Sequence, residues 1–245
     1  MDKTPFSAYD FFAYLASGAM IVVSVDYLFG KQILLRPTLS PQVYVLLVIA
    51  SYIVGQVISH LSAVVLEQWL VKSLLGGSVG MMLTSEHSRS SWARLFPQYF
   101  HGLKPATAAR VMAQAERRGC HLKGDELYDH CYAVVTEASE RAANRLDYLK
   151  SQYGFARNIA FAFFCSAAMI VYEDVVGPRH VSMRWAAVAV GVSVCMLYRY
   201  LKFYREYASE LLKRYAELPV PRAFFRRFSR QDRYTHRPTE LRFRR

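Results

Sequence analysis

Three polar side chains in one apolar stretch have a spacing that could do chemistry. In GQVISHLSAVVLEQ, residues 55–68, Gln56, His60 and Glu67 stand among small and aliphatic neighbours. At about 100° per residue in an α-helix they fall on one face, with Tyr52 close by. Ionisable groups inside a membrane span often mark ion or proton paths, and histidine titrates near neutral pH. Two interpretations stay open: His60 titrates in a water-filled cleft, or Gln56 and His60 hydrogen-bond to another helix while Glu67 is interfacial.

A seam of small residues runs beside this polar stripe. It consists of Ser51, Gly55, Ser59 and Ser62. Small residues one helical turn apart let two helix backbones approach closely within a membrane. The seam therefore predicts a contact with a second helix.

A second motif, ARLFPQYFH, could in principle do enzyme chemistry. Six residues lie between Arg94 and His101. This spacing resembles that of HEPN ribonucleases, in which a dimer presents both side chains to RNA. Leu95 stands where a polar residue is usual, and Pro97 interrupts the helix that the site would need. A nuclease is therefore an alternative and not the leading interpretation.

A third motif, CHLKGDELYDHC, contains side chains that can bind zinc. They are Cys120, His121, His130 and Cys131. Zinc sites usually separate paired ligands by two or more residues, whereas here each pair is adjacent. We therefore expect solvated histidines and buried cysteines, with no metal and no other cofactor. The sequence also lacks a phosphate-binding glycine loop and a nucleophile elbow.

The chain contains four uncharged stretches, and the second of them holds Gln56 and His60. The stretches are residues 11–25, 43–66, 158–172 and 185–198, and the second, 24 residues long, suffices to cross a bilayer. The other three are short enough to be buried soluble helices, but tyrosines and arginines at their ends are typical of membrane interfaces. We predict an all-α protein with four spans at residues 9–29, 43–67, 157–173 and 184–201. The start carries one lysine against two aspartates, so we expect the first segment to be retained rather than cleaved.

Charge distribution predicts the orientation. Residues 1–70 have a net charge of −1, residues 71–198 of +4, and residues 199–245 of +9. The positive-inside rule places the basic end in the cytoplasm, and an even number of spans brings the N-terminus to the same side. The two short connections, 31–40 and 173–184, then face outward. We therefore expect a multi-pass protein of a bacterial inner membrane with both termini in the cytoplasm.

Two predicted cytoplasmic regions follow from this topology. Residues 71–156 form a helical insert: Pro105 opens a helix that ends at Gly119, and a second helical pattern runs from Asp125 to Tyr153, followed by a candidate kink at Gly154. Residues 202–218 extend the fourth span as a helix.

The tail, residues 219–245, has too few aliphatic residues to form a core and is predicted to be disordered. Its arginines suit an anionic membrane surface. The residues we assign to lipid binding are Arg222, Arg226, Arg227, Arg230 and Arg233. Nucleic acid suits the same composition but is the less favoured partner, and a plain topological anchor is the third interpretation.

Three segments together carry a family resemblance: YDFFAYLASGAM, YIVGQVISHLSAVVLE and RLDYLKSQYGFARNIAF. They resemble a group of uncharacterised bacterial inner-membrane proteins with four helices and a cytoplasmic helical insert. The likeness covers most of the chain and brings no activity with it. It implies a motif at the membrane boundary made of Arg145, Tyr153, Gly154, Arg157 and Asn158. From the residues alone, Arg157 is an interfacial arginine and Asn158 a partner for the polar stripe.

The leading functional hypothesis is a membrane anchor or adaptor, not an enzyme. Its cytoplasmic helices and basic tail would meet a protein partner or anionic lipid, and the chain would be free to form a homo-oligomer. The first alternative is an oligomeric channel or transporter component lined by Gln56 and His60. The second is the membrane-tethered nuclease.

Overall fold

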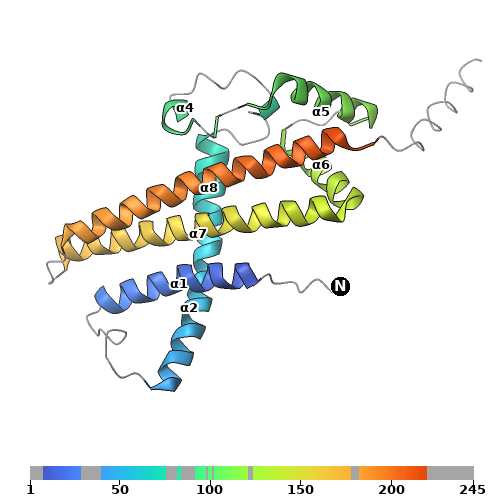
Figure 1. The fold of residues 1–245 in the computed structure, drawn as a ribbon. Helices are drawn as coiled ribbons and strands as arrows, with labels where there is room; N and C mark the ends of the chain where they lie inside the picture. The colour runs from blue at the N-terminus through green and yellow to red at the C-terminus, as the bar shows by residue number, and fades with distance from the viewer. Residues whose placement is uncertain are drawn as a thin grey trace, which may run out of the picture.

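The structure is a computed structural model, and it describes residues 8–28, 40–75, 82–83, 92–97, 99–100, 102–120, 124–177 and 182–219. Within these ranges every regular element is a helix (Figure 1). The elements are α1 (Ala8–Leu28), α2 (Pro41–Ser62), the π-helix η2 (Ala63–Leu74), α4 (Trp92–Leu95), α5 (Pro105–Arg117), α6 (Gly124–Ala138), α7 (Glu140–Val176) and α8 (Met183–Glu217). Four helical segments are long and apolar enough to cross a membrane: Asp10–Leu28, Pro41–Ser73, Glu140–Val176 and Met183–Glu217. The predictions of an all-helical fold and of four candidate spans are confirmed.

Helices α7 and α8 form a long antiparallel pair, and α1 runs parallel to α7 along one side of it (Figure 1). Polar side chains tie these apolar segments together. Ser193 Oγ donates to the Ala160 carbonyl at 2.8 Å, and Ser24 Oγ donates to Ser166 Oγ at 2.8 Å. Each hydroxyl therefore finds a protein partner where no water would be available, which is the condition for a polar group inside a bilayer.

Helices α2 and η2 form one continuous rod that runs across α1, α7 and α8 instead of alongside them (Figure 1). The rod meets α1 at two glycines. A Cβ built on Gly18 would overlap the Ser51 carbonyl and lie 2.6 Å from the Gly55 nitrogen, and a Cβ on Gly55 would overlap the Tyr14 backbone. The two backbones touch directly, so only glycine fits at these positions.

Most of the buried core lies outside the uncharged stretches. Side chains of η2, α5 and α6 pack with the polar halves of α7 and α8, and the fully buried members include Val111, Leu127, Leu146, Leu211 and Tyr215. The second buried cluster, Ile21, Ile58 and Ala162, is much smaller and joins α1, α2 and α7. The first cluster defines a helical unit, comprising α5, α6, residues 140–157 of α7 and residues 199–217 of α8.

Two boundaries differ from the sequence-based expectation. The helix predicted over 125–153 is divided at Ser139, whose φ of −154° is extended and whose hydroxyl caps α7 by accepting from the Ala142 N–H. In contrast, α7 continues through Gly154 without interruption. The helix that opens at Pro105 ends at Arg117, and Gly119 follows with φ of 67°, in the left-handed region.

Candidate functional site

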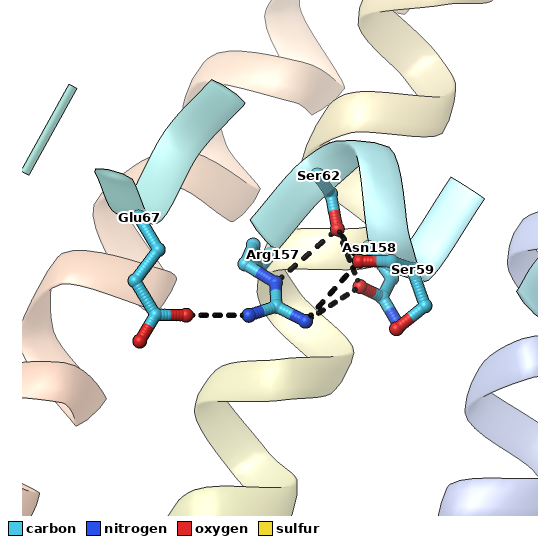
Figure 2. A network of polar contacts seen from close by, with 5 residues as sticks. All are labelled: Ser59, Ser62, Glu67, Arg157 and Asn158. Carbon is cyan, nitrogen blue, oxygen red and sulfur yellow. Dashed lines mark hydrogen bonds and ion pairs between the residues drawn. The ribbon is translucent and has the colours of Figure 1, made fainter. Parts of the chain in front are cut away.

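A polar network lies where the α2–η2 rod crosses α7, and Arg157 is at its centre. Arg157 Nη1 contacts Glu67 Oε2 at 2.6 Å, and Arg157 Nε donates to Ser62 Oγ at 3.2 Å. Arg157 Nη2 lies 3.4 Å from the Ser59 carbonyl oxygen, and Ser62 Oγ donates to Asn158 Oδ1 at 2.8 Å. Figure 2 shows the guanidinium between the Glu67 carboxylate on one side and the Ser59–Ser62 turn on the other. We call these five residues the crossing network.

The crossing network is largely shielded from solvent. Ser62 and Asn158 are 0% and 2% exposed, while the side chains of Arg157 and Glu67 are 12% and 27% exposed. A planar guanidinium can serve several acceptors at fixed angles, which an ammonium cannot. The Arg157 charge is neutralised by Glu67, so the network acts as a clamp between two helices.

The π-helical segment explains why Glu67 joins this network. The sequence-based prediction places Gln56, His60 and Glu67 on one face because it assumes α-helical geometry throughout. The π-helix η2 begins at Ala63, between His60 and Glu67. Because a π-helix closes its bonds at i→i+5, each residue turns the chain through a smaller angle than in an α-helix. Glu67 therefore lies over the face of Ser59 and Ser62.

Gln56 and His60 remain on the exposed side of α2. Gln56 Nε2 donates to the Tyr52 hydroxyl at 3.0 Å, within the same helix, and the Tyr52 ring stacks on Phe11 at 5.3 Å. The polar stripe is thus divided in the structure: Glu67 contacts α7, whereas Gln56 and His60 face outward from the single chain. An oligomer would be needed to enclose these two side chains.

The seam of small residues lies at helix contacts. Ser51, Gly55 and Ser62 are buried, and Gly55 lies against the Tyr14 backbone. Ser59 and Ser62 contribute to the crossing network. The seam therefore faces α1 through its first half and α7 through its second half.

The residues of the boundary motif lie in different environments. Arg157 and Asn158 belong to the crossing network, whereas Tyr153, 7% exposed, packs among tyrosines of α8 with ring centroids 5.5 Å from Tyr204 and 5.6 Å from Tyr207. Arg145 stacks over the Tyr148 ring at 5.4 Å. Gly154 has open space where a side chain would be.

That space belongs to a pocket of about 570 Å³ between α1, α2 and α7. Its lining includes Asp10 and Tyr14 of α1, Ser59 of α2, and the segment of α7 from Asp147 to Asn158. The crossing network forms part of one wall through Ser59, Arg157 and Asn158. We call it the boundary pocket. Gln56 and His60 do not line it.

The two enzyme-like motifs gain no support from the geometry. Arg94 is exposed on α4, and its proposed partner His101 lies outside the described residues. Of the zinc candidates, His121 also lies outside them, and the described part of the chain contains no group of three metal-binding side chains. Burial, with a smaller contribution from Cys120, raises the pKa of the Cys131 thiol to about 12. Cys131 is therefore a protonated core residue at neutral pH.

His130 and the tail complete the set of predicted residues. The His130 ring lies against Tyr215, with ring centroids 5.9 Å apart, between α6 and α8. The tail arginines assigned to lipid, Arg222, Arg226, Arg227, Arg230 and Arg233, lie outside the described residues.

Sequence reasoning did not single out Gly18, Asp147 or Lys150. Gly18 lies in the small-residue run ASGA of the first span, which is a signal for close helix contact. Asp147 and Lys150 carried no local signal, because charged residues on a helix outside the membrane normally face solvent. Their place beside a pocket depends on α1 and α2.

Comparison with known proteins adds no homologue to this description. No protein-family model, no curated protein and no solved structure matches the chain. The function is therefore inferred from the chain's own residues and geometry.

Proposed function

We propose that this protein is a membrane anchor or adaptor of a bacterial inner membrane that presents its helical unit and basic tail to a cytoplasmic partner. One observation carries the proposal. The helical unit shares its core with the same two helices, α7 and α8, that continue as candidate spans. A partner bound to this unit would be held at a fixed position relative to the membrane, because no flexible linker separates the two parts of α7 or of α8.

Contacts at the end of α8 support a rigid unit. Gln114 Nε2 donates to the Leu218 carbonyl at 2.6 Å, and Arg118 Nη2 donates to the Pro219 carbonyl at 3.0 Å. These bonds attach α5 to the last residues before the basic tail. The tail therefore starts from a fixed point on the helical unit, where it meets either the same partner or an anionic membrane surface.

Site-specific photo-crosslinking in cells tests this proposal. A photoreactive residue at Met112, 48% exposed on α5, is expected to give a discrete crosslinked species of higher mass. The same residue at Val188, 55% exposed in the apolar part of α8, is the matched control and is expected to give only lipid adducts. Absence of any protein adduct from Met112 and from further exposed positions of α5 and α6 would contradict an adaptor.

The variant His60→Leu distinguishes the adaptor from the channel. His60 lies on the exposed side of α2. An adaptor is expected to keep its Met112 adduct in this variant. A channel lined by His60 is expected to lose ion flux in this variant, measured in proteoliposomes. The channel hypothesis makes no prediction about the Met112 adduct.

A further inference from the structure

The boundary pocket takes its lining from one end of three of the four uncharged stretches. Asp10 and Tyr14 lie at the start of the stretch in α1, Ser59 lies near the end of that in α2, and Arg157 is the last charged residue before that in α7. These ends coincide with the depth at which a bilayer changes from hydrocarbon to headgroups. A pocket of about 570 Å³ has the size of a small-ligand site.

Four charged side chains line the pocket, and two of them already have partners: Asp10 has an interaction of its own, and Arg157 is paired with Glu67. Arg157 is neutralised by Glu67, which is not part of the lining. Asp147 and Lys150 are exposed, and within the described residues neither has an ion-pair partner. They are three residues apart on α7, so their side chains emerge side by side, roughly 5–6 Å apart at the Cβ atoms. A carboxylate and an ammonium at this separation match a ligand that carries one positive and one negative group.

The walls suit a group at the membrane surface. Tyr14, Tyr148 and Phe155 line the pocket beside Ser151 and Asn158, so aromatic and hydrogen-bonding groups alternate. Tyrosine is amphipathic and is enriched where headgroups meet hydrocarbon. At Gly154 an added Cβ would meet no atom within 4 Å, so this glycine leaves the floor of the pocket open.

We propose that the boundary pocket binds the headgroup of a zwitterionic phospholipid, with the ammonium at Asp147 and the phosphate at Lys150. The acyl chains then lie along the exposed apolar surface of the neighbouring helices. This assignment goes beyond the adaptor role. It concerns a different surface from the basic tail, which favours anionic lipid. A soluble zwitterion has the same headgroup chemistry, but the position at the ends of three apolar segments favours the lipid.

Lipid retention tests the assignment. The full chain is purified from micelles containing equal amounts of phosphatidylethanolamine and phosphatidylglycerol, and bound lipid is counted by native mass spectrometry. We expect at least fivefold more phosphatidylethanolamine on the wild type. Asp147→Asn removes the ammonium partner and leaves Lys150, so it is expected to abolish or reverse this preference. Glu137→Gln, the same charge change at an exposed position of α6 outside the pocket, is expected to leave it unchanged.

Filling the pocket gives a second measurement. Gly154→Trp is expected to lower phosphatidylethanolamine retention about tenfold, whereas Gly191→Trp, at an exposed position of α8 with equal open space, is expected to retain it. Equal retention of the two lipids by the wild type, or no change in Asp147→Asn and Gly154→Trp, would overturn the proposal. Binding of soluble phosphoethanolamine with no lipid retained would also overturn it, in favour of a free ligand. Photo-crosslinking from Met112 does not depend on these substitutions, so the two proposals fail separately.

Discussion

Arg157 connects two helices that are far apart in the sequence. Its guanidinium reaches a carboxylate in η2 and a hydroxyl and a carbonyl in the last turn of α2. Hydrogen bonds to charged groups stabilise proteins by about 1.5–3 kcal/mol, and leaving one partner buried and unpaired costs more than the bond itself contributes. Arg157 is therefore the side chain whose loss should disturb the crossing most.

Substituting Arg157 tests this role at the residue scale. Arg157→Ala leaves Glu67 partly buried without a partner, so the free energy of unfolding is expected to fall by about 1–3 kcal/mol. Arg157→Lys can keep the Glu67 contact but cannot serve the serine acceptors at the same time, so an intermediate loss is expected. The midpoint of thermal unfolding, followed by intrinsic fluorescence in detergent, measures the loss of stability in both variants.

Arg145→Ala provides the control. Arg145 is exposed and stacks on the face of Tyr148, so its removal is expected to change the midpoint little. If Arg157→Ala and Arg145→Ala behave alike, the crossing network does not stabilise the fold.

At the scale of elements, the contact between α1 and α2 depends on glycine. Gly18 and Gly55 each face backbone atoms of the other helix, and backbone cannot move aside as a flexible side chain can. The approach also brings Tyr52 of α2 against the rings of Phe11 and Tyr14, with centroids 5.3 Å and 6.2 Å apart. The contact between α1 and α2 thus combines a close backbone crossing with a cluster of aromatic rings.

Gly18→Ala is expected to push α1 away from α2 and to cost about 1–3 kcal/mol, the usual cost of overpacking a tight contact. Gly191→Ala is the matched control, because a Cβ there meets no atom within 4 Å. Its better helix propensity should leave stability unchanged or slightly raised. The comparison of the two midpoints of thermal unfolding checks the prediction, and equal midpoints would argue against direct backbone contact.

The whole molecule has two parts with different packing. The helical unit buries a large core, whereas the apolar segments bury only a small one and leave large side chains exposed. Among them are Leu46, 64% exposed, Trp69, 76% exposed, and Trp185, 64% exposed. So much exposed apolar surface would drive aggregation in water, and it needs lipid or another protein as its surroundings.

Fractionation of broken cells tests this conclusion. The intact chain is expected to remain in the membrane pellet after ultracentrifugation, to resist extraction by carbonate at high pH, and to enter the supernatant only with detergent. A peripheral protein would be released by carbonate because electrostatic and protein contacts alone would hold it. Recovery of the chain in the supernatant without detergent would contradict every membrane-dependent proposal made here.

Much of the fold was predictable from local pattern. The uncharged stretches define the candidate spans, Pro105 and Gly119 bracket α5, and the long helical register beyond the fourth stretch corresponds to α8. Hydrophobic periodicity and helix-ending residues are local properties, so one sequence suffices to read them. The break at Ser139 was missed because the apolar pattern continues across it and only the capping hydroxyl marks the boundary.

The candidate site was decided by tertiary structure. The sequence by itself determined which segments are apolar, which polar residues interrupt them and where positive charge collects, because these depend on residue types alone. It could not determine that Glu67 turns towards Arg157, since this follows from the π-helical register of η2. Nor could it place Asp147, Lys150 and Gly154 beside α1 and α2, because the boundary pocket exists only once three distant helices have packed around it.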